Sequence, residues 1–284
     1  MKIAVIGDIH LLFSEADATY FNGSDHDLLL FVGDIYNYSP RRGLEVAAEL
    51  ARLDKPALLI PGNHDAAHPT QLAAELTGRS SLIKITGWGH AKRVKQLESI
   101  VGGVNLTGFA VHELGEDLSL VAARPHSMGG QQVAFAPYLQ SAYGISDMSE
   151  SAQRLRELVD QCKGQRLIFL AHNGPVGLGD RRHDIWGCDF RKEEGDHGDE
   201  DLREAIEYAT AQGKRVISVI AGHMHHRLRG GGTRSWSIRR DGILHINAAR
   251  VPRIFREKGA TYHHHIDLHV KADSVEAVEV LRET

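Results

Sequence analysis

Side chains that commonly bind metal ions recur at five places in this sequence, each directly after a short apolar run. In chain order these places hold Asp8 and His10, then Asp34, then Asn63, His64 and Asp65, then His172 and Asn173, and lastly His223 and His225. Carboxylate, imidazole and amide groups together suit divalent manganese, iron or zinc. No thiolate is among them, which argues against a structural zinc site. The pattern therefore predicts a metal centre.

The chemistry of such a centre depends on how many ions it holds. Two divalent ions about 3.5–4 Å apart can clamp both oxygens of an in-line phosphoryl displacement. Such a pair needs a shared anionic ligand, and Asp34, which stands alone after its apolar run, is placed to provide it. We therefore predict two divalent metal ions bridged by Asp34, with manganese favoured and iron or zinc as alternatives.

The apolar runs that precede these side chains are predicted to be buried strands. They cover residues 2–6, 27–32, 57–60, 166–171 and 215–221. Amphipathic segments at 41–53, 149–161 and 199–211 are predicted to be helices. This alternation favours parallel strands with helices packed on the sheet. In open α/β sheets, ligands bind at the carboxyl ends of the strands, which is where all the candidate residues lie.

The rest of the chain completes one α/β domain over residues 1–284. Further helices are predicted at 68–76 and 90–101, a strand at 118–122, and tail strands at 243–247, 263–270 and 275–281. Residues 174–198 form the longest stretch without periodicity. Because a loop of that length inside a compact domain is usually functional, we expect it to shape the substrate pocket.

The composition limits the class of protein. The 284 residues include 33 basic and 37 acidic side chains, for a formal net charge of −4, and this mild acidity argues against a nucleic-acid groove. No apolar run approaches the roughly 20 residues of a membrane helix. Two cysteines cannot build a disulfide framework, and the first residues read directly as a strand rather than as a signal peptide. We therefore expect a cytoplasmic protein with no membrane partner.

The five places, taken in order, resemble the signature of the calcineurin-like metallophosphoesterase superfamily. The matching blocks are Asp8-Ile9-His10, Gly33-Asp34, Gly62-Asn63-His64-Asp65, His172 and Gly222-His223-Met224-His225. The resemblance implies two ion sites that share Asp34. The ligands of the first site would be Asp8, His10, Asp34 and His225, and those of the second would be Asp34, Asn63, His172 and His223. It also implies a four-layer α/β/β/α sandwich of two mixed sheets flanked by helices.

Differences from the superfamily signature indicate which of its branches this sequence resembles. The protein serine/threonine phosphatase branch carries an Asp-Arg-Gly extension after its second block. Here Asp34 is followed by Ile-Tyr-Asn-Tyr-Ser39, which argues against that branch. The segment 121–130, with Tyr143-Gly144 after it, resembles a subgroup from photosynthetic organisms.

Four residues are candidates for roles beside the ions. The resemblance implies that His64 faces the scissile phosphate, as a general acid or as a donor to a phosphoryl oxygen, and that Asn63 touches substrate as well. Asp65 either orients His64 or N-caps the following helix. Arg124 and His126, which follow a predicted strand, either reach a substrate phosphate as charge-assisted donors or take part in a surface ion pair.

Two other polar clusters have simpler interpretations. Alternation along a strand explains the run His263-His264-His265, to which we assign no metal role. The arginines near Gly230, at positions 227, 229, 234, 239 and 240, are expected on a solvated hairpin.

These features predict a binuclear metal-dependent phosphoesterase. It would hydrolyse a small phosphomonoester or nucleotide through a metal-activated hydroxide, with His64 protonating the leaving oxygen. A cyclic-nucleotide or other phosphodiesterase is the alternative, because the same residues serve both reactions. A catalytically inert metal-binding scaffold is disfavoured, because all seven ligand positions and His64 are present. A nuclease is disfavoured, because it would need a row of basic residues along the nucleic-acid backbone. The sequence does not predict an oligomeric state.

Overall fold

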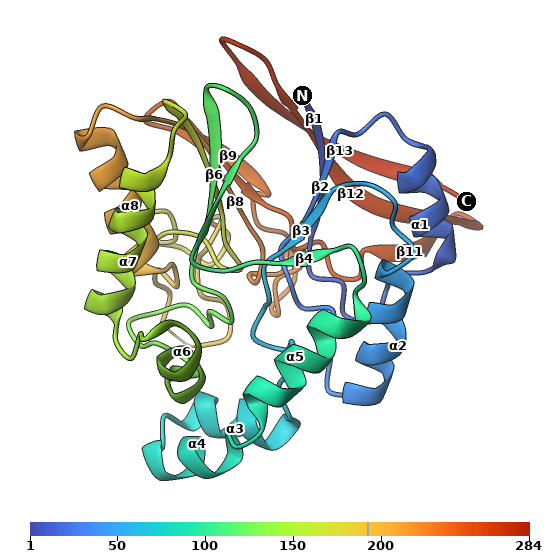
Figure 1. Ribbon diagram of the computed structural model, residues 1–284. Helices are drawn as coiled ribbons and strands as arrows, with labels where there is room; N and C mark the ends of the chain where they lie inside the picture. Colours follow the sequence, from blue (N-terminus) through green and yellow to red (C-terminus); the bar gives the residue numbers. More distant parts are fainter. Residues whose placement is uncertain (192) are drawn as a thin grey trace.

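A computed structural model describes residues 1–191 and 193–284 of the protein. Two β-sheets face each other, and helices cover the outer face of each (Figure 1). Helices α7 (Met148–Gln161) and α8 (Glu200–Ala211) pack on one sheet, and α1 (Glu15–Gly23) and α2 (Pro40–Leu50) pack on the other. The predicted α/β sandwich of two mixed sheets is confirmed.

The first sheet has the strand order β11-β12-β1-β2-β3-β4, with β13 also paired to β12. Strands β1 to β4 run parallel, whereas β12 is antiparallel to β1. The bounds are β1 (Lys2–Ile6), β2 (Leu28–Phe31), β3 (Ala57–Leu59), β4 (Asn105–Leu106), β11 (Ile254–Glu257), β12 (Ala260–Val270) and β13 (Val275–Glu283).

The second sheet has the strand order β5-β6-β7-β8-β10-β9. Its inner strands β6, β7, β8 and β10 run parallel, and β5 and β9 pair antiparallel at the two edges. The bounds are β5 (Ala110–Glu113), β6 (Leu118–Ala122), β7 (Arg166–Leu170), β8 (Arg215–Ala221), β9 (Ser237–Arg240) and β10 (Ile243–Asn247). Four more helices complete the described elements: α3 (Pro69–Thr77), α4 (Ser80–Thr86), α5 (His90–Ile100) and α6 (Ala136–Tyr143).

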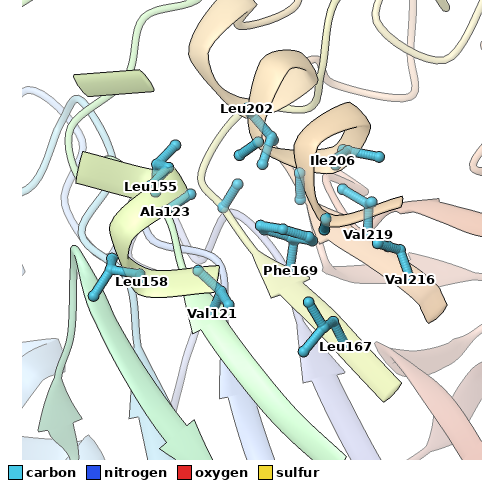
Figure 2. Packing of buried hydrophobic residues seen from close by; sticks show 14 of the residues in the cluster. Val121, Ala123, Leu155, Leu158, Leu167, Phe169, Leu202, Ile206, Val216 and Val219 are labelled. Atoms are coloured by element: carbon cyan, nitrogen blue, oxygen red, sulfur yellow. The ribbon is translucent and has the colours of Figure 1, made fainter. Parts of the chain in front are cut away.

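Alternate side chains of the central strands enter different cores. On β2, Leu28 and Leu30 pack between the two sheets, while Leu29 and Phe31 pack against the helices. On β7, Phe169 faces the helix side, where side chains of α7 and α8 surround it (Figure 2). Because both faces of these strands are buried, each strand reads as a continuous apolar run, as expected for parallel strands covered on both sides.

The strands that carry the candidate site residues lie where the sequence predicts them, within one residue at each end. The strands β4, β5, β9 and β11 and the helices α1, α4 and α6 are not predicted, because each is short and has no clear apolar period. The single domain over 1–284 stays a prediction. In the described ranges, none of the helices has both the length and the apolar content that crossing a bilayer requires.

Candidate metal centre

The carboxyl ends of five strands, three from one sheet and two from the other, bring the predicted ligands together. The side chains follow β1, β2, β3, β7 and β8 directly along the chain. Their donor atoms form two compact groups, of which the first contains Asp8, His10 and His225 and the second contains Asp34, His172 and His223. The candidate centre therefore lies at the edge where the two sheets meet.

The first group consists of two imidazoles and a buried carboxylate. The Nε2 atoms of His10 and His225 lie 3.1 Å apart. His225 Nε2 lies 3.4 Å from Asp8 Oδ2, and His10 Nε2 lies 3.6 Å from Asp34 Oδ2. Separations of this size between several donor atoms suit ligands converging on one ion of 2.0–2.2 Å bond length.

The second group shares Asp34 with the first. Asp34 Oδ1 lies 3.6 Å from His172 Nε2, so the two oxygens of this carboxylate face different groups. Asn63 belongs to the second group, because its Oδ1 lies 3.0 Å from both His172 Nε2 and His223 Nδ1. All seven predicted ligands are thus in one place, four of them buried: Asp8, Asp34, Asn63 and His172.

The histidine tautomers fit a cation in each group. His10 Nδ1 donates to the carbonyl oxygen of Tyr36 at 3.0 Å, and His172 Nδ1 donates to that of Val32 at 2.6 Å. Since a carbonyl oxygen only accepts, the neutral form of each ring carries a lone pair on Nε2. That lone pair faces oxygens of Asp34 or Asn63, which also have lone pairs. A divalent cation between them removes this repulsion, so the donor set fits a metal.

The backbone around the centre is strained. Asp8, His10, Asp34 and His223 have positive φ angles of 28°, 41°, 51° and 66°. For residues other than glycine, such conformations cost about 1–3 kcal/mol each and are concentrated at functional sites. The neighbouring Gly62 cannot be replaced without rearrangement, because a Cβ there would lie 2.2 Å from Asp34 Oδ1.

Burial and neighbouring charges together set the pKa values of the buried groups. Burial alone would raise the pKa of Asp34, but His172, His64 and His10, in their protonated forms, outweigh it and hold that pKa well below its ordinary value. Burial lowers the pKa of His223 well below its ordinary value, and neighbouring His172 adds to this effect. The carboxylate is therefore ionised and the imidazole neutral, which are the forms that bind metals.

His64 lies beside the first group without joining it. Its ring centroid is 5.2 Å from that of His10 and 5.2 Å from that of Tyr38. Its backbone N–H donates to Asp34 Oδ1 at 2.9 Å, which fixes the residue next to the centre. Burial lowers the pKa of His64, while the charge of Asp34 opposes this effect. Within the described ranges, Nδ1 of His64 is buried without a hydrogen-bond partner.

Asp65 has neither of its two predicted roles. It is fully buried, and its carboxylate accepts hydrogen bonds from the backbone N–H groups of Tyr36 at 3.2 Å and Gly62 at 2.8 Å. The N-cap of α3 is His68. Asp65 therefore joins the loops that follow β2 and β3, which positions the candidate ligands instead of touching substrate.

Arg124 and His126 do not fit their predicted contact with a substrate phosphate. Arg124 is buried, with Nε 2.7 Å from Asp201 Oδ2 and Nη2 2.9 Å from Asp199 Oδ1. The alternative of an ion pair is correct, but the pair is in the interior. His126 is also fully buried, and its Nδ1 donates to the carbonyl oxygen of Gly62 at 2.9 Å. Both residues support the loops behind the centre.

Sequence reasoning missed the role of Arg234. This residue is buried instead of lying on a solvated hairpin, and its Nε donates to the backbone carbonyl of His225 at 2.8 Å. Its Nη1 donates to the carbonyls of Arg182, Asp184 and Gly187 at 3.0, 2.9 and 2.7 Å. Arg234 thus ties the 174–198 loop to a candidate ligand, and nothing in the sequence distinguishes it from the neighbouring arginines.

His197, which belongs to that loop, also lies at the candidate centre. Its ring is stacked on that of His223, with centroids 6.1 Å apart and an interplanar angle of 21°. Its Nε2 donates to the carbonyl oxygen of Met128 at 2.8 Å, and its own carbonyl accepts from the side chain of Asn173 at 2.8 Å. The loop is therefore packed against the candidate ligands.

A third group of possible metal ligands, His26, His265 and Asp267, lies apart from the first two, and its donor atoms are closer together. His26 Nε2 and His265 Nε2 lie 2.8 and 3.1 Å from Asp267 Oδ1. These separations are those of hydrogen bonds, shorter than the 3.4–3.6 Å between carboxylate and imidazole in the first two groups. The Lys2 ammonium is 3.1 Å from Asp267 Oδ2 and would repel a second cation.

Comparison with known proteins identifies the family. A family model described as calcineurin-like phosphoesterase matches residues 1–227. No curated protein matches the chain. Among solved structures, one crystal structure has a TM-score of 0.56 at 11% identity, with 99% of this chain and 98% of that chain covered. The structure of PhoD has a TM-score of 0.53 at 10% identity, with 99% and 68% covered.

A metallophosphoesterase from Sphaerobacter thermophilus is 15% identical, with a TM-score of 0.35 and coverage of 99% and 89%. At these identities the two structures with TM-scores above 0.5 bear on the fold alone. The family match covers most of the chain and contains every candidate ligand. The chain therefore belongs to the calcineurin-like phosphoesterase family.

Proposed function

We propose that this protein is a binuclear metal-dependent phosphoesterase that hydrolyses a small phosphomonoester or nucleotide. The observation that carries the proposal is the position of Asp34, whose two carboxylate oxygens each approach a histidine of a different ligand group. A shared carboxylate is what a pair of ions at phosphoryl-transfer spacing requires. The family match supports the class of reaction.

The side chains of both groups have separate tasks in this proposal. Asp8, His10 and His225 would hold one ion, His172, His223 and Asn63 would hold the other, and Asp34 would bind both. When bound, the two ions lower the pKa of a water molecule and offset negative charge on the phosphoryl oxygens. Carboxylate and amide oxygens favour manganese, while the imidazoles also suit iron and zinc.

His64 would act on the substrate. Its ring lies next to His10 and is held there by the hydrogen bond from its backbone to Asp34. An imidazole N–H in this position donates to the leaving oxygen or to a phosphoryl oxygen as negative charge develops there. Tyr38 packs against the same ring and is 70% exposed, so the base of a nucleoside leaving group has an aromatic surface on which to stack.

The alternative is a phosphodiesterase, which would use the same ligands and His64. A different kind of function is that of a scaffold, which would bind the metal ions without catalysing a reaction. Such a scaffold is expected to lack a ligand or the proton donor, whereas all seven ligands and His64 are gathered here. Unpaired Cys162 and Cys188 support the proposed cytoplasmic location.

A substrate screen of the reconstituted protein tests the proposal. Phosphomonoesters, nucleotides and phosphodiesters would each be assayed with manganese, iron and zinc. We expect turnover of monoesters to exceed that of diesters, and turnover by Asp34→Asn to fall by at least about 100-fold. Asp25→Asn, an exposed carboxylate paired with Lys2, is the matched control. Faster turnover of diesters would select the alternative, and no turnover with any metal would select the scaffold.

A further inference from the structure

A cavity lies at the end of the sheets opposite the candidate metal centre. It has a volume of about 200 Å³, and its lining includes Arg166, Arg215, Arg239 and the turn between β12 and β13. Arg166 is the first residue of β7, whereas the candidate ligand His172 follows the other end of this strand. At about 3.3 Å per residue, roughly 20 Å separate the two residues. The cavity is therefore distinct from the candidate metal centre.

The three arginine side chains are held in place by the same turn. Nη2 of Arg166 donates to the carbonyl oxygen of Lys271 at 2.5 Å, and Nη2 of Arg215 donates to that of Asp273 at 3.2 Å. Nη2 of Arg239 donates to the carbonyl oxygen of Val275 at 2.7 Å. These contacts fix the guanidinium groups and leave most of their five N–H donors for another partner.

The charge in this cavity is not balanced. In the part of the chain that the structure describes, none of the three arginines has a carboxylate at ion-pair distance. The three arginines outnumber the two acidic residues of the lining, Asp273 and Glu276, by one, and Glu276 also lies 3.5 Å from the ammonium of Lys271. Nε of Arg166 is buried without a hydrogen-bond acceptor among the described residues. A buried donor without a partner is destabilising, and an anion in the cavity would relieve it.

We propose that this cavity binds a small oxyanion, such as inorganic phosphate or sulfate, away from the metal centre. Arginine presents its donors in a planar fork that matches the oxygens of phosphate and carboxylate groups. Three such forks line a cavity of about 200 Å³, which has room for a tetrahedral anion together with several water molecules. The competing explanation is that the arginines only brace the turn through its carbonyl oxygens.

Binding of inorganic phosphate to the full-length, manganese-loaded protein separates these explanations. Equilibrium dialysis with labelled phosphate should give one bound phosphate per chain at the cavity in addition to any at the metal centre. Asp34→Asn, which disables the metal centre, should retain the phosphate at the cavity. The test therefore works whether or not the protein hydrolyses phosphoesters.

Variants of the cavity complete the experiment. In Arg215→Gln and Arg239→Gln, the affinity of the additional phosphate should fall at least about tenfold, because each removes a charged donor. Inhibition of any hydrolysis by phosphate at the metal centre should be unchanged. Arg240→Gln, at the exposed neighbour of Arg239 on β9, is the matched control and should bind normally.

Two results would overturn the proposal. One is that Asp34→Asn binds no phosphate. This result does not depend on whether any arginine variant folds, because the three arginines are intact in Asp34→Asn. The other is that Arg215→Gln and Arg239→Gln melt at lower temperature yet bind phosphate as the unsubstituted protein does. That combination would assign the arginines to bracing the turn alone.

Discussion

Asp34 faces both ligand groups, and replacing it changes both at once. In Asp34→Asn the shared negative charge is lost, so we expect both ions to bind much more weakly. Elemental analysis after reconstitution should find about two ions per chain in the unsubstituted protein and fewer than one in the variant. Loss of only one ion would show that Asp34 is not the bridge.

His64 can be tested through the leaving group. An alkoxide leaving group needs a proton, whereas a nitrophenolate hardly does, and help from a general acid is worth about 10²–10⁴-fold. We expect His64→Ala to keep its metals and to lose far more rate on alkyl phosphoesters than on nitrophenyl esters. Equal losses on both would assign His64 to stabilising a phosphoryl oxygen, and an unchanged rate would remove it from the reaction.

Arg234 should contribute strongly to stability, although it binds no substrate in our proposal. In Arg234→Gln, the carbonyls of residues 182, 184 and 187 lose a charged donor in a buried environment. We expect the free energy of unfolding to fall by about 3 kcal/mol and the affinity for one ion to weaken, since the His225 backbone is also released. Chemical denaturation and metal titration measure the two effects. Arg229→Gln, on the exposed side of the same segment, should change stability by less than about 0.5 kcal/mol.

At the scale of elements, helix α1 is joined to the C-terminal part of the first sheet by one carboxylate. Asp17 accepts hydrogen bonds from His263 Nδ1 at 2.7 Å and from Arg253 Nη2 at 3.1 Å. Burial opposes ionisation, but these two partners outweigh it and lower the pKa of Asp17 from 3.8 to about 2. Because the folded-state pKa is the lower one, this charge stabilises the fold above about pH 4.

That stabilisation, about 2 kcal/mol from the shift, should disappear as the pH falls from about 4 to about 2. Denaturant melts across this range should show the difference in stability between the unsubstituted protein and Asp17→Asn shrinking toward low pH. A difference that stays constant with pH would contradict the ionised state of Asp17.

The elements that the sequence predicts best are those buried on both faces. Strands such as β1 and β7 are continuous apolar runs because the inter-sheet core and the helix-covered core both require apolar side chains. Edge strands such as β9 (Ser237–Arg240) lack this constraint and read as loops. Helix α1 depends on a capping box at Ser14 and has few apolar residues, so its period is weak.

For the molecule as a whole, the ligand set can be predicted from sequence because each ligand directly follows a predictable strand. What the sequence does not show is which polar residues the packing of distant segments buries. Arg124, Asp199 and Asp201 meet in the interior from widely separated parts of the chain. No local pattern distinguishes such an arginine from one that is placed to bind phosphate.

The candidate metal centre also lies between the two sheets and takes ligands from both. Asp8, His10, Asp34 and Asn63 follow strands of the first sheet, while His172, His223 and His225 follow strands of the second. Each proposed ion would therefore act as a cross-link between the two halves of the sandwich. A ligand bound only by the folded state at 100 times its dissociation constant adds about 2.7 kcal/mol of stability.

Treatment with a chelator should consequently lower the melting temperature by roughly 5 °C or more for each ion removed. The amides of β1 and β7, one from each sheet, should then exchange faster with solvent deuterium. The proposed ions would thus stabilise the folded state as well as take part in catalysis. In a cell short of the metal, the protein would lose its activity and would also be degraded faster by proteases.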